Sequence, residues 1–166
     1  LGVLRKQARD VMILGGSRTA FYLAKMLSNT GNNVKIIDQD RARCRNLCEA
    51  LPNAVIINGD GSQQELLLEE GLRSMDAFVA LTGIDEENIL MSLFAASQNV
   101  PKVISKFNRN ELGDMAEKLG LHEDTVKDLM VLAEDVSGPV LDAVDSAVAA
   151  VVSAVWAAWE DCYEKK

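Results

Sequence analysis

Small residues follow the first apolar run of the chain, in an arrangement that suits the phosphate groups of a nucleotide. The run Val11–Leu14 ends at Gly15, and a segment with helical periodicity begins near Ser17. A dinucleotide turn needs three small residues: one for the tight turn, one where the backbone approaches the pyrophosphate, and one for close packing of helix on strand. These positions fall at Gly15, Ser17 and Ala20. The spacing predicts a phosphate-binding turn at a helix N-terminus, with serine where the second glycine is usual.

An aspartate closes the second apolar run of the chain. Asp38 follows Val34–Ile37, about 20 residues after the glycine turn, where an acidic residue binds the ribose of a dinucleotide. A carboxylate at this point accepts hydrogen bonds from both ribose hydroxyls and repels a 2′-phosphate, which favours NAD(H) over NADP(H). The alternative role for Asp38, capping the next helix, suits Asp40 better.

Polar turns also follow the later apolar runs. The turn at 58–61 contains Asp60 and is placed to contact adenine or its ribose, and Thr82 follows the fourth run, where it is placed to contact the second ribose. Arg18 and Lys106 are expected at the same edge, where each either pairs with phosphate oxygens or is a solvated surface cation. The sequence therefore predicts one ligand-binding edge.

The residue types for covalent or acid–base catalysis do not gather at this edge. No Cys–His pair, Ser–His–Asp set or partnered lysine falls there, and the only histidine, His122, lies beyond the last predicted strand. Cys44 and Cys48 lie four residues apart on a predicted helix, but two thiols are too few for a metal site. The acidic stretch at 85–88 is typical of a helix N-terminus. We therefore expect a sensor rather than an enzyme.

The composition indicates a soluble globular protein. Of the 166 residues, 48% are hydrophobic and 25% are charged. The net charge of −8 argues against a nucleic-acid partner, since the phosphate backbone favours Lys and Arg. No signal peptide opens the sequence, no apolar run reaches the ~20 residues that span a membrane, and three cysteines suggest reduced thiols. We expect a cytoplasmic location.

Strand-like and helix-like segments alternate five times along the chain, with short connections. We expect strands at 11–14, 34–37, 54–57, 77–81 and 103–105, and helices at about 17–29, 41–51, 62–70, 85–98 and 111–119. Ser62 and Glu65 have the spacing of a capping box for the third helix. The alternation predicts an α/β, Rossmann-like, doubly wound parallel sheet of five to six strands with a long C-terminal helix.

We expect three parts along the chain. Residues 1–10 form a lead-in segment, 11–121 the nucleotide-binding domain, and 122–166 an acidic connector followed by a long apolar helix. Within the last part, residues 140–163 have helical spacing and are apolar nearly all round, so this helix must pack on another surface. That surface is either the sheet of its own chain or a second subunit, and two tryptophans favour the second reading.

The order of these motifs resembles the RCK/KTN (TrkA N-terminal) domains, cytoplasmic regulators of potassium channels and of Trk- and Ktr-type potassium transporters. The matching segments are Gly15-Gly-Ser-Arg18, Tyr22-Leu-Ala-Lys25, Ile36-Ile-Asp38, Gly59-Asp60-Gly61, Ala80-Leu-Thr82, Asp85-Glu-Glu-Asn88 and Val103-Ile-Ser-Lys106. The departures from the family pattern are Ser17, Ala20, Gly61, Ser62 and Lys106.

The resemblance implies a regulatory module that binds NAD(H), with ATP/ADP or AMP as alternatives, and that assembles as dimers or larger rings. The residues carried over are Gly15, Ser17, Arg18 and Thr19 for phosphate, Asp38 for ribose, Asp60 near adenine, Thr82 and Lys106 for the rest, and Gly16, Gln39 and Gly61 to complete the site. The implied partner is a membrane-embedded potassium transporter or channel subunit, with the domain at the inner face of the membrane. The alternatives are a nucleotide-free assembly module of the same fold and an NAD-dependent oxidoreductase.

Overall fold

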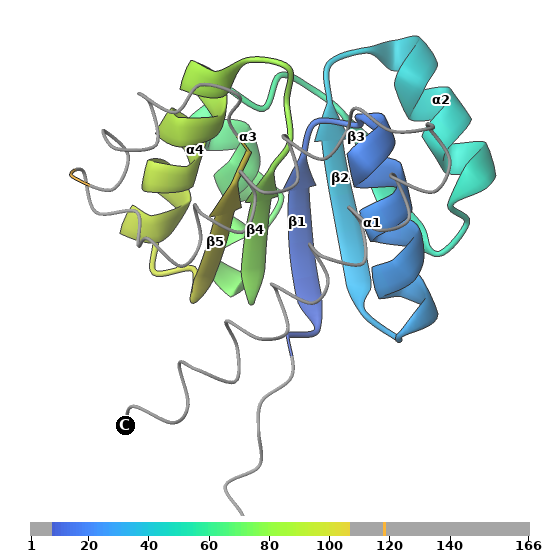
Figure 1. Cartoon of the computed structure of the whole chain (residues 1–166), viewed down its shortest axis with the longest axis horizontal. Coiled ribbons are helices and arrows are strands. Elements are labelled where there is room, and N and C mark those ends of the chain that lie inside the picture. Colours follow the sequence, from blue (N-terminus) through green and yellow to red (C-terminus); the bar gives the residue numbers. More distant parts are fainter. Residues whose placement is uncertain (1–7, 107–117, 119–166) are drawn as a thin grey trace, which may run out of the picture.

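The computed structural model describes residues 8–106 and Lys118. Five parallel strands form one sheet in the order β3-β2-β1-β4-β5 (Figure 1). The strands are β1 (Asp10–Leu14), β2 (Asn33–Asp38), β3 (Ala54–Asn58), β4 (Ala77–Ala80) and β5 (Lys102–Ser105). The helices are α1 (Arg18–Asn29), α2 (Arg41–Ala50), α3 (Gln64–Glu69), the 3₁₀ turn η1 (Leu72–Ser74) and α4 (Asp85–Ser97).

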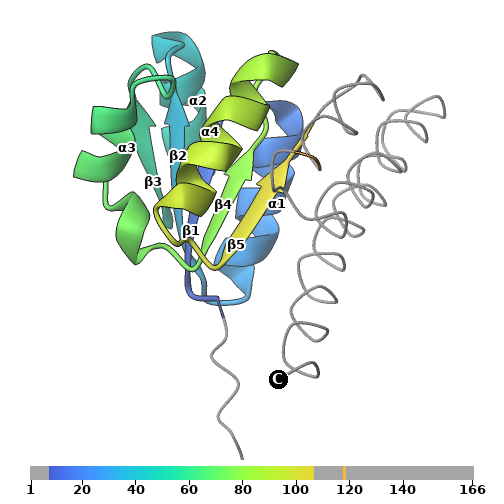
Figure 2. The same cartoon turned by 90° about the vertical axis from the view of Figure 1, so that its left-hand side faces the viewer.

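The helices cover both faces of the sheet (Figure 2). One apolar cluster joins α1 and α2 to β1 and β2 through residues such as Leu23, Leu47 and Ile13. The other joins α3, η1 and α4 to the opposite face through residues such as Leu67 and Phe78. The expected doubly wound parallel sheet is therefore confirmed within the described residues.

The strand order has one reversal, between β1 and β4. The chain first adds β2 and β3 on one side of β1, then crosses to add β4 and β5 on the other side. The loops after β1 and β4 therefore leave the sheet in opposite directions and open a crevice at the carboxyl edge. The predicted turns at Gly15 and Thr82 follow these two strands.

Local sequence explains where the first two helices begin. The Ser17 hydroxyl accepts a hydrogen bond from the Ala20 N–H at 3.3 Å, and Asp40 Oδ1 accepts from the N–H groups of Ala42 and Arg43 at 2.8 and 3.0 Å. Both are side-chain N-caps, which satisfy donors that the helix leaves unpaired. The predicted capping role of Asp40 is confirmed.

The predicted capping box of the third helix is wrong. The Ser62 hydroxyl donates to Asp60 Oδ1 at 2.7 Å, and α3 begins two residues later, at Gln64, without a side-chain cap. The serine is thus used to stabilise the preceding turn, which is the common alternative use of this residue type. The turn η1 was also not predicted.

Several predictions lie outside the described residues. These are the helix at 111–119, the connector that begins at 122, and the long helix at 140–163. Within 8–106, none of the helices has the length and apolar character to cross a bilayer.

Candidate functional site

A cleft opens at the carboxyl edge of the sheet, at the reversal between β1 and β4. Its volume is about 260 Å³, near the lower end of the range for ligand pockets, roughly 300–1,000 Å³. It is lined by Leu14, Gly15, Gly16, Ser17, Ile37, Asp38, Gln39, Arg43, Asp60, Gly61, Leu81, Thr82, Gly83, Ile84 and Glu87. Most of the residues predicted from the sequence therefore come together here. Arg18, Thr19 and Lys106 are not among the lining residues.

Gly15 forms the tight turn after β1. Its φ is +91°, a conformation that side chains rarely adopt, and a Cβ there would lie 2.9 Å from the Leu81 carbonyl oxygen and the Thr82 nitrogen. The Gly15 N–H donates to the Ile37 carbonyl at 2.8 Å, which fixes the turn against β2. Only glycine satisfies both the backbone angle and the close approach of the β4 loop.

Ser17 occupies the position where the fingerprint usually has a second glycine. Its φ of −63° and ψ of 169° are ordinary for any residue, so serine introduces no backbone strain. The first-turn N–H groups of Arg18 and Thr19 have no acceptor within the helix and lie at its positive end. Ala20 is fully buried, as close helix–sheet packing requires. The serine and alanine at these positions therefore preserve the geometry of a phosphate-binding turn.

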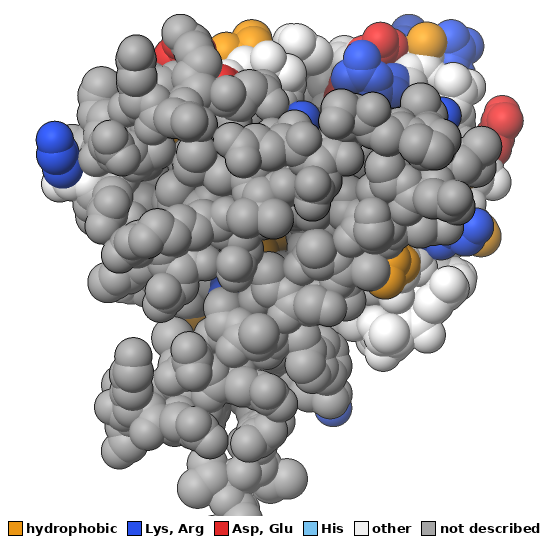
Figure 3. All heavy atoms as spheres, in the orientation of Figure 1, with side chains coloured by type: hydrophobic (Ala, Val, Ile, Leu, Met, Phe, Trp, Pro, Cys, Tyr) orange, Lys and Arg blue, Asp and Glu red, His pale blue; other side chains and the backbone are white. Residues whose placement is uncertain are grey.

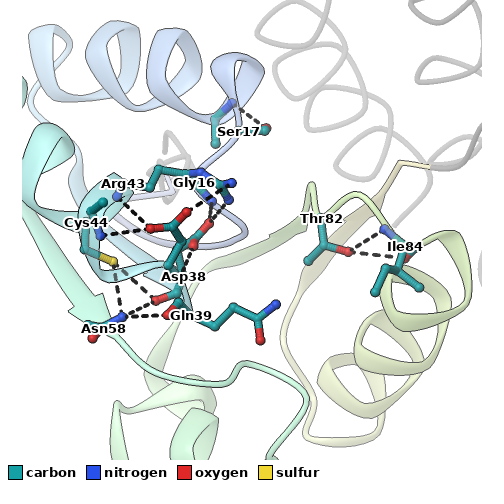
Figure 4. Close-up of polar contacts among 12 residues, drawn as sticks. Gly16, Ser17, Asp38, Gln39, Arg43, Cys44, Asn58, Thr82 and Ile84 are labelled. Atoms are coloured by element: carbon teal, nitrogen blue, oxygen red, sulfur yellow. Dashed lines mark hydrogen bonds and ion pairs between the residues drawn. The ribbon is translucent and has the colours of Figure 1, made fainter.

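Asp38 lies buried at the end of β2, between the glycine turn and α2 (Figure 4). Its Oδ2 accepts a hydrogen bond from the Gly16 N–H at 2.6 Å, and its Oδ1 accepts from the Asp40 N–H at 2.7 Å. The carboxylate thus joins the loop after β1 to the start of α2. A Cβ on Gly16 would lie 3.0 Å from Oδ2, so glycine permits this contact.

Arg43 contributes the cation of the cleft that the sequence analysis did not identify. Its Nη1 lies 2.8 Å from Asp38 Oδ2, and its Nη2 lies 3.7 Å from Asp40 Oδ2. The sequence does contain an indication of this position, because Asp40 is the expected N-cap of the helix and Arg43 is the third residue after it. The third residue after an N-cap is in the first helical turn, close to the same edge.

The turn after β3 brings Asp60 and Gly61 to the cleft. Asp60 accepts hydrogen bonds from the hydroxyl and N–H of Ser62 and from the side chain of Gln63. These donors, the Ser62 hydroxyl first, lower the pKa of Asp60. A Cβ on Gly61 would lie 1.9 Å from Cδ1 of Leu14. Alanine at this position therefore requires the Leu14 side chain to move, which accounts for glycine in this chain.

A buried amide fixes the loop after β4. Asn88 is fully buried in α4 and accepts hydrogen bonds from the Thr82 N–H at 2.9 Å and from its hydroxyl at 2.7 Å. Its Nδ2 donates to the Thr82 carbonyl at 3.1 Å and to the Lys106 carbonyl at 2.8 Å. The acidic stretch at 85–88 is thus more than a helix start, because its last residue ties the ends of β4 and β5 together.

Glu87 adds a third carboxylate to the cleft wall. Partial burial, followed by the charges of Asp60 and Asp38, raises the pKa of Glu87. Arg43 is the one basic side chain among the described lining residues. The cleft therefore combines a helix N-terminus, which favours an anion, with three carboxylates. Together these groups suit a phosphate attached to a neutral, hydroxyl-rich group.

Curated relatives with clear sequence identity are potassium uptake proteins. The Trk system potassium uptake protein TrkA of Haemophilus influenzae is 41% identical over 106 residues, which cover 64% of this chain and 23% of that protein. The TrkA homolog 2 of Methanosarcina mazei is 35% identical over 129 residues, covering 74% of this chain and 29% of that protein. The chain thus spans less than a third of the length of either relative.

Solved structures with low sequence identity share the fold. The TrkA-N domain of the inner membrane protein ybaL from Escherichia coli has a TM-score of 0.62 at 14% identity, covering 70% of this chain and 86% of that one. The GsuK channel bound to NAD has a TM-score of 0.59 at 15% identity, with coverages of 71% and 21%. The Shewanella denitrificans Kef CTD in AMP bound form has a TM-score of 0.55 at 15% identity, with coverages of 94% and 99%.

The sequence profile of the TrkA-N domain matches residues 11–126. This match runs from the second residue of β1 through β5 and includes the glycine turn and Asp38. It confirms the resemblance seen in the order of the sequence motifs, and the chain belongs to the TrkA-N domain family.

Proposed function

We propose that this chain is a nucleotide-sensing regulatory domain of a potassium transport system. It binds NAD(H) or an adenine nucleotide in the cleft between the ends of β1 and β4. One observation carries this proposal: the Gly15 turn, the N-terminus of α1 and the buried Asp38 meet at the reversal point of the sheet. Ligands of open parallel α/β sheets bind at such a point.

The residues of the cleft fit an adenine nucleotide. The Gly15 turn leaves the backbone bare beside the first turn of α1, where the N–H groups of Arg18 and Thr19 are donors for phosphate oxygens. Asp38 is the acceptor for ribose hydroxyls, Asp60 and Gly61 lie beside the adenine end, and Thr82 borders the remainder. Arg18 and Lys106 act from outside the lining, and Gln39 completes the wall beside Asp38.

NAD(H) is the favoured ligand, with AMP, ADP and ATP as alternatives. Asp38, Asp60 and Glu87 all line the cleft, and their negative charges disfavour a second phosphate on the ribose that Asp38 would bind. This supports NAD(H) over NADP(H). The fold neighbours bound to NAD and to AMP are consistent with either a dinucleotide or a mononucleotide.

The bound nucleotide acts as a signal in this proposal. A ligand changes the behaviour of a partner only if it binds two arrangements of the protein with different affinities. We propose that those arrangements differ in dimer geometry, that the dimer forms through residues 140–163, and that the partner is a membrane-embedded potassium transporter or channel subunit. The domain would then act in the cytoplasm, at the inner face of the membrane, without catalysing a reaction.

A thermal-shift experiment tests the ligand-binding part of the proposal. The unfolding temperature is measured with NAD⁺, NADH, AMP, ADP and ATP, each in large excess. A ligand that binds only the folded protein stabilises it by about 2.7 kcal/mol at a hundred-fold excess over its Kd. We expect at least one of these nucleotides to raise the unfolding temperature.

Replacing Asp38 tests the location of the site. In Asp38→Asn the affinity for the nucleotide that binds is expected to fall roughly ten- to a hundred-fold, because a hydrogen bond to a charged group is lost. Glu49→Gln, an exposed change on α2, is the matched control and should bind normally. An absence of stabilisation by all five nucleotides would contradict the proposal and favour the nucleotide-free assembly module. Turnover of NADH would favour the oxidoreductase.

A further inference from the structure

The guanidinium of Arg43 lies against the carboxylate that the proposed function assigns to ribose. Nη1 of Arg43 is 2.8 Å from Asp38 Oδ2, the oxygen that also accepts the Gly16 N–H. The Asp38 side chain is 3% exposed and that of Arg43 is 49% exposed. The pair therefore has one buried partner and one partner at the rim, and Figure 4 shows the contact between the two side chains. Cδ of Arg43 also lies 3.2 Å from the point where a Cβ on Gly16 would be.

The hydrogen-bonding capacity of Asp38 is nearly filled. Oδ2 accepts from Gly16 and Arg43, and Oδ1 accepts from the Asp40 N–H. A carboxylate offers about four lone-pair sites. The two backbone donors are fixed by the turn and by the start of α2. A ribose diol brings two further donors, so both are accepted only if the Arg43 donor leaves.

A second partner for the guanidinium is already adjacent. Nη2 of Arg43 lies 3.7 Å from Asp40 Oδ2. The other oxygen of Asp40 accepts the Ala42 and Arg43 N–H groups and caps α2. Arg43 can therefore transfer to Asp40 without breaking the cap. The movement stays within one side chain at the rim. Figure 3 shows basic and acidic side chains gathered at the upper right of the molecule, where Figure 1 has α2.

We propose that Arg43 is a specificity-determining residue that competes with the ligand's vicinal diol for Asp38 and transfers to Asp40 when the ligand binds. This inference rests on the proposed function. The competition lowers the affinity for any nucleotide that uses Asp38, because the apparent Kd includes the cost of releasing Arg43. It does not affect a ligand that makes no use of the diol. Binding also moves the guanidinium charge of Arg43 from Asp38 to Asp40, so it changes the charge distribution at the start of α2.

Calorimetric titration of the full chain tests the inference, with NAD⁺, AMP and 2′-deoxy-AMP as probes. The variant is Arg43→Gln, and the matched control is Arg45→Gln, which removes the same charge from an exposed position of the same helix. We expect Arg43→Gln to bind NAD⁺ and AMP more tightly by roughly three- to ten-fold, the size of one hydrogen bond to a partly exposed charged group. The gain for 2′-deoxy-AMP should be less than about two-fold, since it lacks one competing hydroxyl. Arg45→Gln should bind all three probes like the unaltered chain.

Three results would overturn the inference. The first is unchanged or weaker binding of NAD⁺ and AMP by Arg43→Gln, which would mean that Arg43 assists the ligand. The second is an equal gain for AMP and 2′-deoxy-AMP, which would place the effect away from the diol. The third is no binding of any probe by any of the proteins; the proposed function is contradicted as well only if NADH, ADP and ATP also leave the unfolding temperature unchanged. Should Arg43→Gln fail to fold, Arg43→Lys preserves the charge but removes the Nη1 donor; its affinity for AMP should lie above that of the unaltered chain, and the same three results would overturn the inference.

Discussion

At the scale of single residues, the cleft is defined by charges that do not balance. Asp38, Asp60 and Glu87 line it, and Arg43 is the basic side chain that the described lining provides. Arg43 is held by Asp38 and Asp40 at the α2 side of the cleft. Glu87, on α4, therefore faces like charges across the opening. A ligand that brings hydroxyls to Asp38 and phosphate to the start of α1 is compatible with this distribution.

Glu87 gives a pH-dependent prediction. Its pKa is raised by partial burial and then by Asp60 and Asp38. An acid whose pKa is higher in the folded state stabilises the fold below its unfolded pKa, and this contribution is lost as the pH rises through the folded pKa. We therefore expect Glu87→Gln to raise the unfolding temperature at pH 7. The difference from the unaltered chain should shrink as the pH approaches about 4, the ordinary range of a glutamate.

The control for this prediction is Glu49→Gln, at an exposed position on α2. Its unfolding temperature should follow the unaltered chain at both pH values. An unfolding temperature of Glu87→Gln that is lower at pH 7, or shifted equally at both pH values, would show that Glu87 is not repelled in the folded protein.

At the scale of the elements, the start of α1 decides whether this chain has a working phosphate-binding turn. Ser17 stands where a dinucleotide-binding turn usually has glycine, and the backbone there is in an ordinary extended conformation. The hydroxyl caps the helix by accepting the Ala20 N–H. Compared with glycine, serine therefore adds a cap to α1 and leaves the backbone conformation of the turn ordinary.

The capping role of Ser17 predicts an ordered set of stabilities. Ser17→Ala should lower the free energy of unfolding by about 1 kcal/mol, and Ser17→Gly by only a few tenths of a kcal/mol, because glycine is accepted at an N-cap. Urea unfolding of the three proteins measures the difference. Equal losses in both variants would mean that the hydroxyl does not cap α1.

Much of this framework could be predicted from the sequence because buried parallel strands are continuous apolar runs. Each run ends in a turn at the same edge, so Gly15, Asp38 and Thr82 could be assigned to one site. The spacing of Arg43 from the Asp40 N-cap also indicates a position near this edge. The contact of Arg43 with Asp38 and the place of Glu87 beside the other carboxylates could not be predicted, because they depend on how the helices are oriented over the sheet.

The error at Ser62 has a similar cause. The spacing from Ser62 to Glu65 fits a capping box, but Asp60 lies two residues earlier and takes the serine hydroxyl. Local side-chain hydrogen bonds compete with helix capping, and the sequence pattern does not show which one prevails.

At the scale of the whole molecule, the described part presents a cleft at the carboxyl edge of a TrkA-N fold. The match to the family covers residues 11–126, whereas the potassium uptake relatives are much longer than this chain. The division into 1–10, 11–121 and 122–166 stays a prediction. So does the role of residues 140–163, which lie outside the described residues.

The assembly prediction can be tested in the full chain. If residues 140–163 form an apolar interface between two copies, a charge at Val152 should disrupt it, because an unpaired buried charge is costly. We expect light scattering to give a dimer or larger mass for the unaltered chain and a lower mass for Val152→Asp. Asn53→Asp, at an exposed turn residue, adds the same charge and should leave the mass unchanged. A monomeric unaltered chain would contradict the interface.

The central claim is that a nucleotide binds between the Gly15 turn and Asp38, and backbone amide resonances report on it most directly. In a ¹⁵N–¹H titration of the full chain with NAD⁺, we predict that the largest shifts occur at Gly16, Arg18 and Thr19 and that they saturate together. Their amides lie at the turn and at the first turn of α1, where a phosphate would accept hydrogen bonds. Shifts that spare these three amides, with saturation at residues elsewhere in the chain, would contradict the account.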